Sequence, residues 1–110
     1  MSYSVYTTPT FKRLFKRLYK KHPSLKADIQ KLIALLGNKP VNGIPLGYGV
    51  YKIRVAISSK TKGKSGGARV ITYVITENKE VYLIHIYDKG QLDNISKEKI
   101  LDLLRKANLL

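Results

Sequence analysis

The chain has 110 residues, of which 44% are hydrophobic and 9% aromatic, so it is long and apolar enough to fold as a single domain spanning residues 1–110. Lys and Arg number 21 against 7 Asp and Glu, which gives a formal net charge of +14, and there is no cysteine. These figures exclude a disulfide scaffold, a cysteine-ligated zinc site and a cysteine nucleophile, and they predict a polyanionic partner. The sequence shows no signal peptide and no run of ~18 apolar residues, so we expect a cytoplasmic protein with no membrane partner.

The first part of the chain predicts a short strand followed by two helices. β-branched and aromatic residues over positions 3–7 are typical of a strand. A helix over 8–22 starts at a Thr-Pro pair, carries apolar residues at helical spacing and ends at a His-Pro pair. A second periodic stretch over 24–37 starts at a serine and ends at a Gly-Asn pair. Recurrent Pro, Gly and Asn predict an irregular loop over 38–49.

The second part predicts a β-meander and a last helix. Period-2 or β-rich patterns indicate strands over residues 50–57, 69–76 and 81–87. The segment 58–68 is rich in Ser, Lys and Gly, which is typical of a hairpin tip. Apolar residues return to helical spacing over 96–107, after a serine that can cap the helix. We therefore expect an α+β fold in the order β-α-α-β-β-β-α. Its small sheet of about four strands is antiparallel, mixed where the first strand pairs at an edge, and has helices covering one face.

The first helix is strongly basic on the face opposite its apolar stripe. Asp28 is the only acid between Met1 and Thr76, so surface ion pairs do not account for so many cations. A one-sided field of this kind attracts phosphate backbones, although a merely solvated face is the simpler alternative. Two partners fit this surface, nucleic acid or an acidic protein inhibitor. The candidate contact residues on the first helix and the 58–68 loop are Lys12, Arg13, Lys16, Arg17, Lys20, Lys60, Lys62 and Lys64.

A second group of cations belongs to the sheet. Period-2 geometry places Lys52 and Arg54 on one face, and a hairpin brings Arg69 to the neighbouring strand. Lys89 follows the last strand. Like charges opposite one another are unfavourable in a sheet, so cations without carboxylates there indicate a phosphate site, with Arg offering a bidentate fork. The Gly-Lys-Ser of residues 63–65 is not a P-loop, because Ser58 stands where the motif needs its first glycine.

Two further side chains on the last strand are candidates for the same site. Leu83, His85 and Tyr87 stand at every second position of the last strand and so point to the same face. His85 therefore lies either in the core or on the face of the cations. Tyr87 either packs in the core or stacks on a base or binds a phosphate. No paired carboxylates stand out, which argues against metal-ion nuclease and glycosidase chemistry, and we expect no metal and no cofactor.

These residues carry a family resemblance over essentially the whole chain. The segments 51–56 (YKIRVA), 66–71 (GGARVI) and 82–89 (YLIHIYDK) resemble the HigB-type branch of the RelE/ParE toxins of bacterial toxin–antitoxin modules. RelE-like members of that family are ribosome-dependent endoribonucleases that cut messenger RNA and are neutralised by a partner antitoxin. The resemblance implies the same activity here, without metal, by attack of the RNA 2′-OH to leave a 2′,3′-cyclic phosphate.

The resemblance also implies roles for individual residues. The family's basic pair on the second strand falls on Lys52 and Arg54, its third-strand arginine on Arg69, and the basic residue after the last strand on Lys89. A tyrosine that the family has near the last helix corresponds to Ile95 here, so Tyr87 and His85 are the candidates for the general base. The implied partners are an antitoxin, the ribosome, and messenger and ribosomal RNA, with DNA reached only through the antitoxin complex.

Two other functions are compatible with the sequence. A ParE-like inhibitor of DNA gyrase shares the fold and differs in target, but such members generally lack the cluster of Lys52, Arg54 and Arg69. A non-catalytic nucleic-acid-binding module is the third alternative. The exposed aromatic pair of an RNA-recognition sheet and a clear helix-turn-helix are both absent from the sequence.

Overall fold

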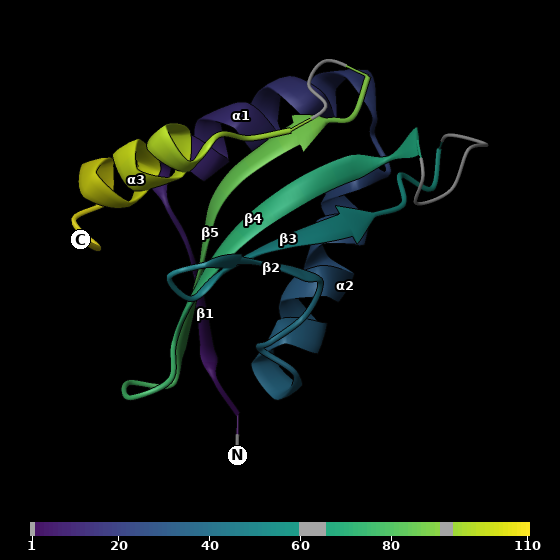
Figure 1. The fold of residues 1–110 in the computed structure, drawn as a ribbon. Coiled ribbons are helices and arrows are strands. Elements are labelled where there is room, and N and C mark those ends of the chain that lie inside the picture. The colour runs from purple at the N-terminus through teal and green to yellow at the C-terminus, as the bar shows by residue number, and fades with distance from the viewer. Residues whose placement is uncertain (1, 60–65, 91–93) are drawn as a thin grey trace.

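The structure is a computed structural model that describes residues 2–59, 66–90 and 94–110. Within these residues the helices are α1 (Pro9–Lys21), α2 (Leu25–Asn38) and α3 (Lys97–Lys106), and the strands are β1 (Ser4–Thr7), β2 (Ile44–Gly47), β3 (Val50–Val55), β4 (Ala68–Ile75) and β5 (Glu80–Asp88). They form one sheet in the order β1-β5-β4-β3-β2 (Figure 1). All neighbours are antiparallel except β1 and β5, which confirms the α+β fold with mixed pairing at an edge.

The sheet has one more strand than the sequence predicts. Within the expected 38–49 loop, β2 pairs with β3 through Ile44 opposite Lys52. Gly43 has a φ of +88°, and a Cβ there would lie 2.3 Å from the Lys52 carbonyl oxygen, so the close approach of the two chains requires glycine. The four residues IPLG contain a proline and a glycine and follow no alternation, which is why period-2 reasoning misses the strand.

The helix boundaries follow the expected local chemistry. The Thr8 side chain accepts a hydrogen bond from the Phe11 N–H at 3.3 Å, and a proline opens α1. The Ser96 hydroxyl accepts one from the Lys99 N–H at 3.1 Å and begins α3. Ser24 precedes α2 without such a cap, because its hydroxyl is hydrogen-bonded to Asp28 instead. Capping thus accounts for the starts of α1 and α3, and all three helices begin within a residue of their predicted starts.

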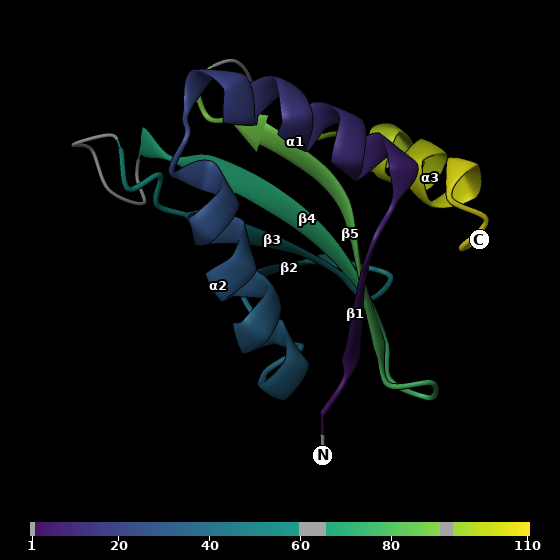
Figure 2. The same cartoon turned by 180° about the vertical axis from the view of Figure 1, so that it is seen from behind.

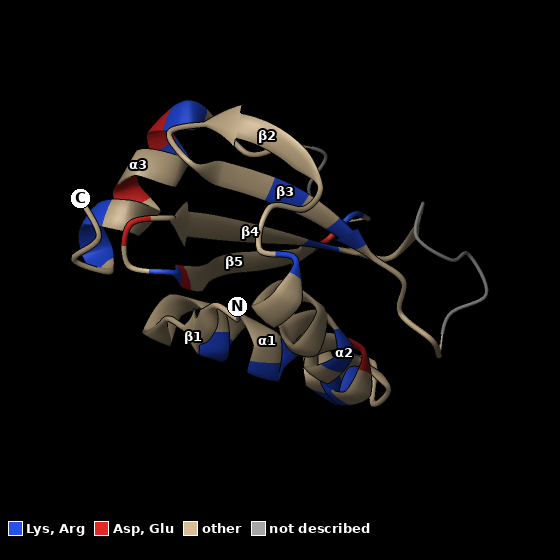
Figure 3. Ribbon diagram, turned by 90° about the horizontal axis from the view of Figure 1, so that it is seen from below, with Lys and Arg blue, Asp and Glu red and all other residues tan. Residues whose placement is uncertain are grey.

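Helices cover both faces of the sheet, so the prediction of a single covered face is wrong. α1 and α2 pack on one face, where residues such as Leu36, Ile53 and Leu83 form the larger core. α3 packs on the opposite face, where Leu104 joins Ile71 in a second core (Figures 2 and 3). An apolar stripe shows that a helix packs on something, but not on which side of a sheet.

An irregularity in β5 decides which side chains share a face. Thr72 lies opposite Leu83, but Ile71 lies opposite His85, so Ile84 is an extra residue in β5. Leu83 belongs to the core beneath α1 and α2, whereas Ile84 belongs to the core beneath α3. A bulge of this kind shifts the alternation by one residue. In a regular strand His85 would share a face with Leu83, two residues before it. Because of the bulge, His85 lies on the α3 face of the sheet instead.

Candidate functional site

The site begins with a row of three residues across three neighbouring strands. Arg54 of β3 lies opposite Arg69 of β4, which in turn lies opposite Tyr87 of β5. Directly opposed residues share a face of the sheet, with Cα atoms ~5 Å apart. Tyr87 packs in the core beneath α3, so the whole row lies on the α3 face. The structure therefore brings together three residues that are separated by up to 33 positions in the sequence.

The next row adds a lysine and a histidine. Lys52 of β3 and His85 of β5 both lie opposite Ile71 of β4, one on either side. Arg54 is exposed and Lys52 half-buried, so both cations reach solvent. Arg69 differs, since only 4% of it is exposed and its guanidinium Nη1 donates a hydrogen bond to the Ala68 carbonyl at 3.2 Å. A buried guanidinium beside the exposed Arg54 forms the kind of anchored positive surface that a phosphate group needs.

His85 is buried and neutral at physiological pH. Burial, followed by the charge of Lys99 on α3, lowers the pKa of its imidazole from 6.5 to about 4. Its ring centroid lies 5.7 Å from that of Tyr87. Among the residues that the structure describes, none hydrogen-bonds the buried Nδ1. An uncharged imidazole with an available nitrogen can accept a proton from a substrate that reaches it.

Lys89 stands at the end of β5, beside the chain that enters β4. Its backbone N–H donates to the Gly67 carbonyl at 3.2 Å, and its side chain is exposed. A Cβ on Gly67 would lie 2.1 Å from the Val55 carbonyl oxygen, so glycine lets this segment pass close to β3. Lys89 is therefore fixed next to the Arg54–Arg69–Tyr87 row through its backbone, while its ammonium group remains accessible.

Two acidic residues have roles that the sequence does not reveal. Asp88 accepts a hydrogen bond from the Gly90 N–H at 2.9 Å. It also pairs with Nε2 of His22 at 3.5 Å. Asp28 on α2 is buried and accepts hydrogen bonds from the Ser58 hydroxyl, the Ser58 N–H and the Ser24 hydroxyl. Burial by itself raises the pKa of the Asp28 carboxyl. The hydrogen bonds from Ser58 and Ser24 and the charge of Lys31 outweigh this effect, so the pKa lies below its usual value of 3.8. Asp28 thus ties the end of the β3 segment to α2.

The basic face of α1 is exposed, as predicted. The face lies along the helix that covers β5, and α1 has no acid in its first turn (Figure 3). Its exposed cations are Lys12, Arg13, Lys16, Arg17, Lys20 and Lys21. The predicted contacts Lys60, Lys62 and Lys64 lie outside the described residues.

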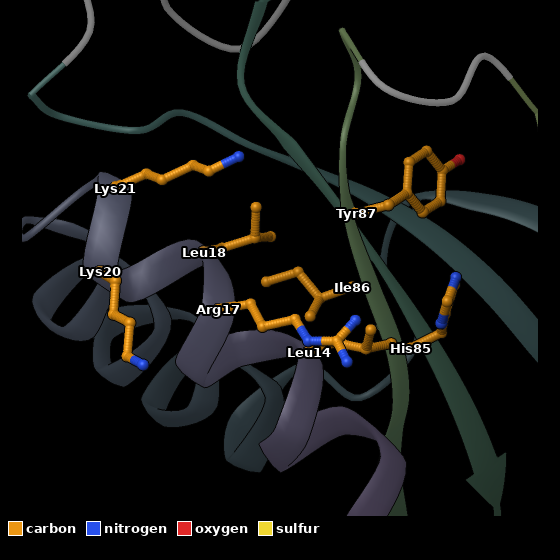
Figure 4. Close-up of a pocket in the computed structure, with 8 residues that line it drawn as sticks. All are labelled: Leu14, Arg17, Leu18, Lys20, Lys21, His85, Ile86 and Tyr87. Atoms are coloured by element: carbon orange, nitrogen blue, oxygen red, sulfur yellow. The ribbon is translucent and has the colours of Figure 1, made fainter.

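A groove of about 620 Å³ separates the end of this basic face from β5. Leu18 of α1 and Ile86 of β5 point toward each other across it, while Arg17 and Lys21 extend from α1 toward the strand (Figure 4). Tyr87 also lines the groove. The groove therefore adjoins the strand that carries part of the site.

Other parts of the site are apolar or uncharged. Ile95, at the position of the family tyrosine, packs against the core beneath α3 and supplies no acid or base.

Over residues 2–59, 66–90 and 94–110, no three His, Asp or Glu side chains gather as a metal site would require. No helix in those ranges is long and apolar enough to cross a membrane.

Comparison with known proteins agrees with this architecture. Residues 5–109 match the family described as the RelE toxin of the RelE/RelB toxin–antitoxin system. The fold is similar to that of a double-arginine mutant of the Escherichia coli toxin RelE in the free state, with a TM-score of 0.61 and 17% sequence identity. The similarity covers 96% of this chain and 98% of that chain, and at this identity it concerns the fold. With nearly its whole length matched, this chain belongs to the RelE toxin family of toxin–antitoxin systems.

Proposed function

We propose that this chain inhibits translation as a metal-independent endoribonuclease that cuts messenger RNA on the ribosome. Membership of the RelE family makes it the toxin of a toxin–antitoxin pair. One observation carries the finer proposal, namely the row of Arg54, Arg69 and Tyr87 beside Lys52 and His85 on one face of the sheet. Cations and a neutral imidazole together are what cleavage of RNA by its own 2′-OH requires.

The chemistry follows from what RNA supplies. The 2′-oxygen attacks the adjacent phosphorus, its proton leaves to a base, and the bond from phosphorus to the 5′-oxygen breaks as that oxygen gains a proton. The products are a 2′,3′-cyclic phosphate and a 5′-OH. Negative charge grows on the phosphorane oxygens, so fixed cations stabilise the transition state more than the substrate.

Each cation has a role that its position supports. Arg69 is buried and held by the Ala68 carbonyl, and it clamps the phosphate together with the exposed Arg54 opposite it. Lys52, one row away, stabilises the phosphorane charge and assists deprotonation of the 2′-OH. Lys89, exposed at the end of β5, stabilises the leaving 5′-oxygen.

His85 is the better of the two candidates for the general base. It lies on the face of the cations, and no described residue hydrogen-bonds its Nδ1. Burial lowers its pKa to about 4, so the imidazole is uncharged at neutral pH. Tyr87 lies beside it, with the rings tilted by 41°, and lines the groove between α1 and β5, where it bounds the path of the RNA. We assign proton transfer to His85 and substrate positioning to Tyr87.

The partners follow from charge. A chain of net charge +14 with a basic α1 docks on ribosomal RNA, and the cognate antitoxin neutralises the toxin by covering cationic surface with an acidic segment. DNA contact occurs only through the antitoxin complex. The HigB-type branch stays a prediction, as does a cytoplasmic location.

The test is a translation reaction programmed with a defined message, in which new 5′-ends are mapped by primer extension with and without the protein. We expect cleavages that need translating ribosomes, persist with a metal chelator and vanish in the Lys52→Ala/Arg69→Ala variant. The variant Lys26→Ala/Lys39→Ala removes two exposed charges, one in the first turn of α2 and one just after its end, and serves as the matched control. An intact message with normal protein output contradicts the proposal and directs attention to a supercoiling assay with gyrase.

A further inference from the structure

The groove between α1 and β5 exists because one strand pairing stops halfway along β5. β1 pairs with β5 only as far as Thr7 opposite Leu83, and the Thr8 N–H and hydroxyl both donate to the Leu83 carbonyl. The chain then leaves the sheet and turns into α1. Over the described residues, no strand pairs with the outer edge of β5 beyond Leu83, and α1 runs alongside instead (Figure 2).

The lining of this groove is apolar at its base and cationic at its rim. Leu14 and Leu18 of α1 and Ile86 of β5 form the apolar part. Arg17 and Lys21 reach toward β5 on either side of Leu18, which faces Ile86 (Figure 4). Asp88 lies close by on β5, but it pairs with His22 and no acid lines the groove. The volume of about 620 Å³ falls within the range of ~300–1,000 Å³ typical of small-ligand sites.

We propose that this groove binds one nucleotide of the RNA strand next to the scissile phosphate, with its base on the apolar lining and its phosphate held by Arg17 and Lys21. The proposal rests on the proposed ribonuclease function. The groove adjoins the segment of β5 that carries His85 and Tyr87, so a strand whose phosphate lies on the Arg54–Arg69–Tyr87 row continues into it over a short path.

The charge pattern favours RNA over an acidic peptide. Arg17 and Lys21 end a cationic face that runs the length of α1, from Lys12 onward, without an acid in its first turn. An RNA strand supplies both a negative charge at every residue for this continuous face and a flat base for the apolar lining, whereas an acidic side chain supplies only the charge. Apolar side chains beside the aromatic Tyr87 suit the flat surface of an unstacked base.

The experiment measures RNA binding by the free, full-length protein. A fluorescent single-stranded RNA hexamer, with 2′-O-methyl groups that prevent cleavage, is titrated at several salt concentrations. We expect Arg17→Ala/Lys21→Ala to lower the slope of log K against log salt by about 0.7, since the two side chains hold one phosphate and each phosphate contact on a single strand contributes about 0.7. The control Lys26→Ala/Lys39→Ala removes the same charge outside the groove and should leave the slope unchanged. Equal slopes for the two variants overturn the proposal.

Crosslinking locates the base independently of charge. A 4-thiouridine in the same hexamer should crosslink to peptides containing Leu14–Lys21 or Ile84–Tyr87, and crosslinks confined to other peptides overturn the proposal. A polyglutamate peptide that binds in an Arg17- and Lys21-dependent way, where RNA does not, also overturns it. If the translation assay shows no cleavage while RNA still crosslinks to the groove, the ribonuclease function is wrong and the groove stands. If cleavage holds and crosslinks lie elsewhere, only the groove is wrong.

Discussion

Arg54 and Arg69 lie directly opposite each other on β3 and β4, one exposed and the other 4% exposed. Like charges at directly opposed positions repel each other across a sheet. In the proposed mechanism the scissile phosphate binds against both guanidinium groups.

Replacing the exposed arginine should separate activity from stability. We expect Arg54→Ala to raise the free energy of unfolding by up to ~0.5 kcal/mol, because cross-strand repulsion disappears. The same change should lower message cleavage by about 10²-fold, as expected on loss of a group that stabilises transition-state charge. Urea denaturation and primer extension measure the two effects. The control is Arg105→Ala, which removes an exposed cation on α3 and should change neither stability nor cleavage. A loss of stability in Arg54→Ala would contradict the cross-strand repulsion between the two arginines.

His85 should make stability depend on pH in a defined window. Its pKa is 6.5 unfolded and about 4 folded, so between these values the unfolded chain binds more protons and stability rises with pH. This stability is present above pH 6.5 and is lost as pH falls toward 4, by about 3 kcal/mol.

The measurement is the free energy of unfolding from pH 7 to pH 4 for the wild type and for His85→Asn. The variant should be less pH-dependent in this window. Asp28 does not interfere, because its pKa is lowered from 3.8 and its contribution is lost only below that pH. Parallel curves for the two proteins would show that the imidazole titrates normally in the folded state.

The Asp28 network should be a main support of the fold. Asp28→Asn replaces an acceptor of hydrogen bonds from Ser58 and Ser24 with an amide that has only one acceptor oxygen. We expect a loss of about 2 kcal/mol, since hydrogen bonds to a charged carboxylate contribute roughly 1.5–3 kcal/mol. Asp102→Asn, at the half-exposed partner of Lys106 on α3, should cost less than ~1 kcal/mol in the same denaturation experiment.

Gly67 should be needed for both stability and activity. A Cβ there meets the Val55 carbonyl oxygen at 2.1 Å, so Gly67→Ala must push the chain away from β3 and shift the Gly67 carbonyl that holds Lys89. We expect lower stability and slower cleavage. Gly37→Ala is the matched control, because its Cβ meets nothing closer than the Tyr3 carbonyl oxygen at 3.6 Å, and alanine favours the helix by roughly 0.5–1 kcal/mol. Equal effects of the two substitutions contradict the steric argument.

The sequence by itself determined the local elements and the chemical character of the site. Capping residues such as Thr8 and Ser96, and the change of apolar period after residue 49, placed the helices and the three central strands. Alternation along β3 was enough to put Lys52 and Arg54 on one face of the sheet and Ile53 on the other. These features depend on residues close in the chain, and local sterics and hydrogen bonding decide them.

Only the tertiary structure decided where His85 and Tyr87 point, which face α3 covers, and that Arg69 is buried. The extra residue Ile84 arises from pairing between β4 and β5, and without it His85 and Tyr87 would lie beneath α1 with Leu83. Likewise the groove that ends at Ile86 exists because β1 leaves the sheet at Thr7. Both depend on register between segments distant in sequence, where a one-residue shift moves every following side chain to the other face.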